Sequence, residues 1–104
     1  MMKHPNIVEL YNYTENDFGI FLHMEYCNDP TFFVDHIEVT MQPFTDEAVL
    51  RRYALDILKG LDFIHSKNII HGDIKIQNCL WNMNPDGTDV IKICDFGLSL
   101  VCNE

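Results

Sequence analysis

The sequence is short of basic residues. It has 7 Lys and Arg against 16 Asp and Glu, which gives a formal net charge of -9 over 104 residues. A surface that binds a phosphate backbone needs clustered cations, and here the cations are dispersed along the chain. We therefore expect no nucleic-acid partner, and the acidity alone points to no other class of partner.

The cysteines lack the spacing of a metal site. None of the four forms a C-x-x-C pair or a zinc-ligand pattern: Cys27, Cys79, Cys94 and Cys102. Reduced thiols in a reducing compartment are the simplest interpretation of such cysteines. We therefore expect a cytoplasmic protein, with the nucleus as the second candidate.

Long apolar runs are also absent. No stretch of 18 apolar residues occurs, and residues 1–5 lead into a polar segment rather than the apolar part of a signal peptide. We expect neither a membrane span nor a signal peptide, and no membrane partner. The length is that of one small domain, and 47% hydrophobic residues are enough for a core.

Two apolar runs near the N-terminus predict a hairpin. Residues 8–13 and 20–25 are rich in strand-forming side chains, and residues 14–19 hold polar residues and a glycine that favour a turn. Asp29 and Pro30 then suit the cap and first position of a short helix over residues 31–37. His23 and His36 have no partners at metal-ligand spacing, so we interpret both as structural.

A long amphipathic helix is predicted over residues 45–67. Thr45 suits its N-cap, and Asn68 tolerates the left-handed conformation that often ends a helix. Seven apolar side chains recur at helical spacing and predict one buried face: Leu50, Tyr53, Ala54, Ile57, Leu58, Leu61 and Ile64. Short strands at residues 69–70, 79–81 and 90–94, with a turn at residues 84–87, complete an α+β pattern.

Polar groups suited to phosphate and Mg²⁺ chemistry gather after this helix. Residues 71–78 read H-G-D-I-K-I-Q-N and bring an acid, an amine and an amide together, and the sequence D-F-G follows at residues 95–97. We interpret His71 as a packing and hydrogen-bonding residue beneath this loop rather than an acid–base catalyst. Taken alone, Asp95 would be a solvated loop acid, and Phe21, Met24 and Tyr26 would be ordinary hairpin core residues.

The two stretches, in this order after a long helix, resemble the catalytic loop H-R-D-x-K-x-x-N and the D-F-G motif of the protein kinase family. The resemblance implies an α+β, two-lobed, protein-kinase-like partial domain, from the fourth strand of the small lobe to just past D-F-G. It assigns residues 1–24 to the end of the small lobe, residues 25–29 to the hinge and residues 30–104 to the start of the large lobe.

The resemblance also implies catalytic and metal-binding roles. Asp73 would be the base for the substrate hydroxyl, and Lys75 would neutralise charge on the transferred phosphoryl group. Asn78 and Asp95 would bind Mg²⁺. Lys75 is similar to the serine/threonine type of kinase, so the implied partners are ATP and a protein substrate with Ser or Thr.

Four further residues would bind the nucleotide in this resemblance. Met24 would be the gatekeeper, and the backbone of Glu25 and Cys27 in the hinge would hydrogen-bond adenine. Leu80 would form the floor beneath the adenine ring.

The chain departs from the family pattern in two ways. Gly72 replaces the Arg that usually precedes the catalytic Asp, which predicts a smaller role for activation-loop phosphorylation. The glycine-rich loop, the strand lysine with its helix glutamate, and the segments after D-F-G are missing from residues 1–104. We therefore expect the isolated chain to be inactive and marginally stable. The alternatives are a non-catalytic, pseudokinase-like interaction module and, more weakly, a small metal-binding domain.

Overall fold

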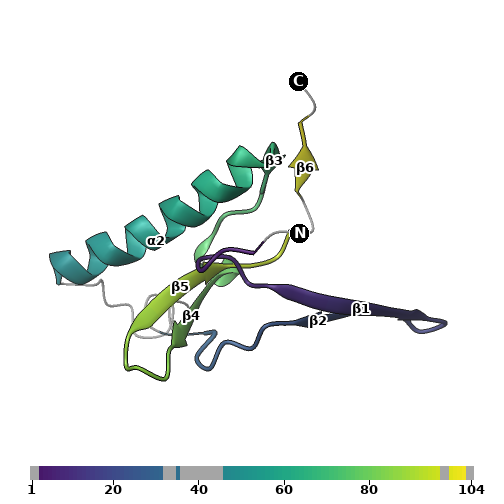
Figure 1. The fold of residues 1–104 in the computed structure, drawn as a ribbon, viewed down its shortest axis with the longest axis horizontal. Coiled ribbons are helices and arrows are strands. Elements are labelled where there is room, and N and C mark those ends of the chain that lie inside the picture. Colours follow the sequence, from purple (N-terminus) through teal and green to yellow (C-terminus); the bar gives the residue numbers. More distant parts are fainter. Residues whose placement is uncertain (1–2, 32–34, 36–45, 97–98, 103–104) are drawn as a thin grey trace.

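The computed structural model describes residues 3–31, 35, 46–96 and 99–102, and it confirms the α+β class (Figure 1). In chain order the elements are β1 (Leu10–Asn16), β2 (Gly19–Met24), α2 (Glu47–Ser66), β3 (Ile69–Ile70), the short 3₁₀ helix η2 (Ile76–Asn78), β4 (Cys79–Met83), β5 (Asp89–Ile93) and β6 (Leu100–Val101). The strands form three two-stranded antiparallel sheets: β1 with β2, β3 with β6, and β4 with β5.

The predicted N-terminal hairpin is confirmed, but its bounds were wrong. Strand β1 begins at Leu10 and continues through Asn16, because Thr14 and Glu15 pair with residues of β2 rather than turning. Val8 lies before the strand, where its N–H donates to the Ile93 carbonyl at 3.0 Å. Every residue of β1 and β2 is exposed, and the hairpin projects as an arm from the rest of the chain (Figure 1).

Helix α2 begins one residue later than predicted. Asp46 is its N-cap, because the Asp46 carboxylate accepts from the Ala48 and Val49 N–H groups. Thr45, the predicted cap, lies outside the described residues, as does most of the predicted helix at residues 31–37. The predicted end is confirmed, since Asn68 has a φ of 61°.

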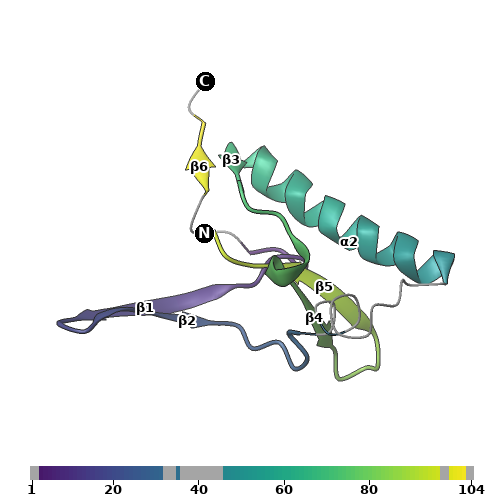
Figure 2. The ribbon, with the colours of Figure 1, turned by 180° about the vertical axis from the view of Figure 1, so that it is seen from behind.

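Only part of the predicted apolar face of α2 is buried. Tyr53, Gly60 and Ile64 are buried, but Leu50 and Leu58 are 47% and 58% exposed, so the prediction for these two was wrong. Ala54, also assigned to that face, is exposed too. The reason is that the described elements cover α2 on one side, where β4 and β5 lie (Figure 2).

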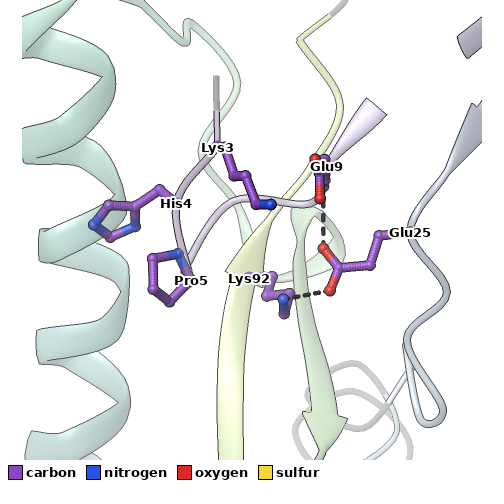
Figure 3. Close-up of a pocket in the computed structure, with 6 residues that line it drawn as sticks. All are labelled: Lys3, His4, Pro5, Glu9, Glu25 and Lys92. Atoms are coloured by element: carbon purple, nitrogen blue, oxygen red, sulfur yellow. Dashed lines mark hydrogen bonds and ion pairs between the residues drawn. The ribbon is translucent and has the colours of Figure 1, made fainter. Parts of the chain in front are cut away.

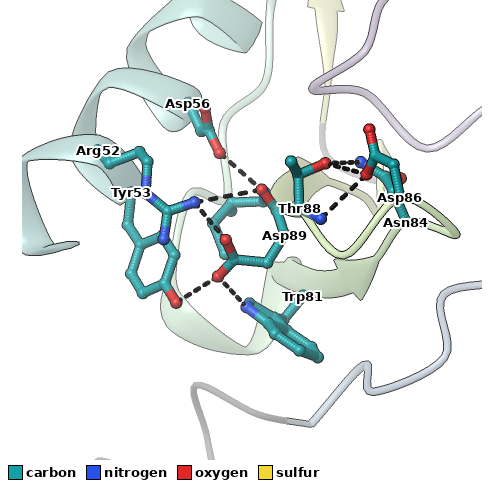
Figure 4. Close-up of polar contacts among 9 residues, drawn as sticks. Arg52, Tyr53, Asp56, Trp81, Asn84, Asp86, Thr88 and Asp89 are labelled. Carbon is teal, nitrogen blue, oxygen red and sulfur yellow. Dashed lines mark hydrogen bonds and ion pairs between the residues drawn. The ribbon is translucent and has the colours of Figure 1, made fainter.

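An unpredicted polar cluster joins α2 to the β4–β5 hairpin (Figure 4). The Asp89 carboxylate accepts from Arg52, from the Tyr53 hydroxyl at 2.7 Å and from the Trp81 indole at 2.9 Å. These donors, Arg52 first, hold the pKa of Asp89 well below its usual range. The Asp56 carboxylate also accepts from the Ile91 N–H at 3.0 Å. Both contacts fix the helix against β5.

The segment before β1 completes the core. Ile7, Ile64 and Ile93 form one buried cluster, and Tyr53, Cys79 and Ile91 form another. Helix α2 contributes Ile64 to the first cluster and Tyr53 to the second. The Asn6 carbonyl accepts from the Ile93 N–H at 2.9 Å, so the N-terminal segment lies along β5.

Two expectations about absences can be compared with the described residues. All four cysteines are free thiols in the structure. Among the described residues, no helix combines the length and the apolar character that a bilayer crossing requires.

Candidate active site

The structure brings Asp73, Lys75 and Asn78 together in the loop between β3 and β4. The Asn78 amide donates to the Asp73 carbonyl at 2.9 Å and to the Asp73 carboxylate at 3.2 Å. The Lys75 ammonium lies 3.6 Å from the same carboxylate. Asn78 is buried at 6% exposure, so its two bonds to Asp73 fix the carboxylate more firmly than the half-exposed lysine does.

His71 is a buried residue that hydrogen-bonds the backbone of this loop, as predicted. Its side chain is 1% exposed, its Nδ1 accepts from the Asp73 N–H at 3.1 Å, and its Nε2 lies 2.8 Å from the Cys94 carbonyl. Because Nδ1 accepts, Nε2 carries the proton and donates to Cys94. Both ring nitrogens are therefore occupied in holding the backbone on either side, and the imidazole is not directed at a substrate.

Asp95 directly follows Cys94, whose carbonyl is bound by His71. The Cys94 N–H donates to the Asn78 carbonyl at 2.9 Å, which places the segment before Asp95 alongside the end of the catalytic loop. Asp95 has a φ of 61°, a left-handed conformation that costs a non-glycine residue roughly 1–2 kcal/mol. The Phe96 ring packs against His71 with 4.8 Å between centroids, as expected for a residue beneath the loop. This packing holds the backbone on the C-terminal side of Asp95.

The oxygen atoms of Asn78 and Asp95 fit the preferences of Mg²⁺. Magnesium is usually bound by one or two carboxylates together with substrate phosphates and waters. The Asn78 amide nitrogen is engaged by Asp73, so Oδ1 is the atom that would bind the metal. Among the residues that the structure describes, no group of three or more His, Cys, Asp or Glu side chains gathers as a metal site.

The predicted hinge lies between the β1–β2 arm and the β4–β5 hairpin. Met24 ends β2 and is 49% exposed. The Glu25 N–H donates to the Glu9 carbonyl at 2.8 Å, and Cys27 is buried at 4% exposure. The Glu25 carboxylate binds the Lys92 ammonium at 2.5 Å, and Lys92 is itself buried at 8% exposure. A part-buried ion pair therefore connects the predicted hinge to β5.

Leu80 lies on the same side of the β4–β5 hairpin as the hinge. Cys79 and Trp81 pack toward α2, so alternation along the strand directs Leu80 to the opposite face. Leu80 is the antiparallel partner of Lys92, whose side chain reaches Glu25. The predicted floor residue and the predicted hinge thus share one face of the sheet.

The Glu25–Lys92 ion pair also lines a cavity of about 270 Å³ (Figure 3). Its lining is mostly charged and comes from the N-terminal segment before β1, the predicted hinge and β5: Lys3, His4, Pro5, Glu9, Glu25 and Lys92. None of the predicted catalytic or metal-binding residues lines it. We place the candidate active site at the Asp73 loop, because the acid, amide and amine converge there.

The cysteines near the site are poor nucleophiles. Burial raises the pKa of Cys79 to about 11, and burial followed by the charge of Asp95 raises the pKa of Cys94 to about 11. Both are neutral thiols at pH 7, whereas the thiolate is the reactive form. Neither thiol is therefore suited to act as a nucleophile at this loop.

Sequence reasoning missed three residues that position the hinge. Lys92 lies within an otherwise apolar strand, and a lysine at such a position predicts an acidic partner for its ammonium group. Asn28 and Asn82 contact each other from 54 positions apart. No local pattern distinguishes either asparagine from the other polar residues of the chain.

Comparison with known proteins gives consistent matches. The sequence model described as protein kinase domain matches residues 1–104. Over 98 residues, the chain is 37% identical to the human and the mouse serine/threonine-protein kinase DCLK3 and 34% identical to zebrafish serine/threonine-protein kinase PLK4. Each alignment covers 94% of this chain, but only 15%, 12% and 10% of the respective relative.

Proposed function

The chain belongs to the protein kinase family, and we propose that it forms the centre of a catalytic domain that transfers the γ-phosphate of ATP to a serine or threonine hydroxyl of a protein. In this proposal residues 1–24 end the small lobe, residues 25–29 are the hinge and residues 30–104 begin the large lobe. The kinase relatives named above are serine/threonine kinases, and Lys75 matches the pattern of that type.

The observation that carries the proposal is the fixed position of Asp73, whose carboxylate is bound by Asn78 and whose backbone N–H is bound by His71. Its position is set by the Asn78 amide at 3.2 Å and by the Asp73 N–H bound to His71 at 3.1 Å. A fixed carboxylate can orient the substrate hydroxyl and accept its proton. Lys75 lies close enough to neutralise charge on the phosphoryl group during transfer.

Asn78 and Asp95 would hold Mg²⁺, which neutralises charge on the nucleotide phosphates when it is bound. The left-handed backbone of Asp95, between the supported Cys94 and the packed Phe96, supports a metal-binding role, because strained residues cluster at functional sites. At the other end of the site, the backbone of Glu25 and Cys27 would bind adenine, with Met24 beside it and Leu80 beneath it.

A non-catalytic interaction module remains the second candidate. The observation in its favour is the β1–β2 arm, which exposes large apolar side chains such as Phe18 at 92% and Ile20 at 64%. Exposed apolar surface of this kind is typical of a protein contact. Binding of a protein partner in the absence of nucleotide, without ATP-dependent labelling of a basic substrate, would favour this candidate.

The proposal is tested with Asp73→Asn and Asp95→Asn in the full-length protein that carries this chain. We expect each substitution to abolish transfer of radiolabelled phosphate from ATP to a basic protein substrate. Asp62→Asn, an exposed acid on α2, is the matched control and should keep full activity. Undiminished transfer in either the Asp73 or the Asp95 variant would contradict the assigned roles.

A further inference from the structure

Asn28, just after the proposed adenine-binding residues, is bound to strand β4 by three hydrogen bonds. Its backbone N–H donates to the Asn82 side chain at 3.0 Å. Its side-chain amide donates to the Met83 carbonyl at 2.8 Å and accepts from the Met83 N–H at 2.9 Å. The Asn28 amide thus pairs with Met83 in both directions, as a peptide group does in a sheet.

Such two-way pairing fixes orientation as well as position. One hydrogen bond leaves a loop free to rotate about it, whereas two bonds to the same residue define the plane of the amide. The next residue continues the contact, because Asp29 forms an antiparallel bridge with Trp81. Asn28 and Asp29 therefore behave as a short third strand on the β4–β5 hairpin, although the sequence around them predicts no strand.

The hinge is consequently held at both of its ends. At the N-terminal end, the Glu25 carboxylate binds Lys92 at 2.5 Å and the Glu25 N–H binds Glu9 at 2.8 Å. At the C-terminal end, Asn28 is bound to β4 as described. Cys27, whose backbone would bind adenine, lies between these two anchors and is buried at 4% exposure.

Strand β4 is also the strand that carries two proposed site residues. Asn78, the proposed metal ligand, directly precedes it, and Leu80, the proposed floor, is its second residue. The contact of Asn28 with Asn82 and Met83 therefore connects the adenine-binding edge of the site to its floor and metal end through one rigid element.

We propose that Asn28, together with Asn82, is a positioning residue that holds the hinge in the conformation that binds ATP; this rests on the proposed function. Neither side chain touches the nucleotide in this proposal. Their substitution lowers the fraction of molecules whose hinge is ready to bind, and the apparent dissociation constant rises in inverse proportion to that fraction. Removal of the two Asn28 side-chain bonds should weaken MgATP binding roughly three- to tenfold.

The experiment compares variants of the full-length protein that carries this chain. Asn28→Ala removes both bonds to Met83, and Asn82→Ala removes the acceptor for the Asn28 N–H. Asn82→Asp is the rescue variant, since a carboxylate oxygen still accepts that bond. Asn12→Ala is the matched control, because the side chain of this exposed asparagine on the β1–β2 arm accepts from the neighbouring Tyr13 N–H. For each variant the dissociation constant for MgATP, the kcat, and the KM for ATP and for the protein substrate are measured.

We expect both alanine variants to raise the dissociation constant and the KM for ATP, with kcat and the KM for protein substrate within about twofold of wild type. Asn82→Asp and Asn12→Ala should match wild type. An unchanged dissociation constant for MgATP in Asn28→Ala or Asn82→Ala would overturn this inference but not the proposed function. A fall of kcat in both alanine variants, with an unchanged KM for ATP, would also overturn it, because that result indicates a general loss of structure. If Asn28→Ala does not fold, Asn82→Ala decides by the same criteria. Wild-type protein that binds no MgATP would overturn the proposed function as well.

Discussion

The Asp89 cluster allows one prediction to be worked out in detail. Asp89→Ala removes an acceptor that binds Arg52, the Tyr53 hydroxyl and the Trp81 indole, and Tyr53 is buried at 5% exposure. Hydrogen bonds to a charged group are each worth about 1.5–3 kcal/mol when buried. The Arg52 contact is discounted, because that side chain is 47% exposed and exposed ion pairs contribute little.

The two remaining bonds predict a loss of about 3–6 kcal/mol in the free energy of unfolding. The assay is urea unfolding of the 104-residue chain at pH 7 and low temperature, with a stabilising osmolyte so that the wild type starts folded. Fluorescence of Trp81, the single tryptophan, reports directly on the cluster. Tyr53→Phe should lose about half as much, roughly 1.5–3 kcal/mol, since it removes one of the two bonds. A loss below about 0.5 kcal/mol in Asp89→Ala would refute the reasoning.

The same cluster predicts a pH dependence. Because the folded pKa of Asp89 is lowered, its stabilisation is complete above the unfolded pKa of about 3.9 and is lost as the pH falls through the folded value. The difference in stability between wild type and Asp89→Asn should therefore be constant between about pH 5 and 8 and shrink at lower pH. A difference that grows on acidification would contradict the assigned direction.

Two further predictions concern packing and stability. Gly60→Ala would place a Cβ 2.9 Å from the Asn6 carbonyl oxygen and 2.9 Å from the Ile93 Cδ1, so we expect a loss of about 1–3 kcal/mol in the same unfolding assay. Lys59→Ala, the exposed neighbour, is the control and should change little. The 104-residue chain alone should be marginally stable, because large apolar side chains on the β1–β2 arm and on α2 are exposed. A cooperative thermal transition well above room temperature would show this to be wrong.

Much of the fold could be predicted from short stretches of sequence. The α2 helix, its end at Asn68, the β1–β2 hairpin and the turn before β5 each follow from periodicity or turn chemistry within a few neighbouring residues. The candidate site was equally local, because Asp73, Lys75 and Asn78 lie within one short loop. Their spacing alone brings an acid, an amine and an amide together.

Tertiary structure decided which of these local features meet. Leu50 and Tyr53 belong to the same helical pattern, yet only Tyr53 is covered, because β4 and β5 lie on its side of α2. Strand β6 was not predicted, since its pairing partner β3 is about 30 residues away and each strand has only two residues.

The sequence also did not predict which distant residues the polar side chains bind. Asn28 and Asn82 are 54 positions apart, and Glu25 and Lys92 are 67 apart. A helical or strand period specifies which face a residue occupies, but not which distant residue lies opposite that face. The residue types and spacing in the sequence therefore predicted that an acid, an amine and an amide lie together in the loop at residues 71–78. The anchoring of the proposed hinge to β4 and β5 arises only when the chain folds, because it depends on contacts between distant segments.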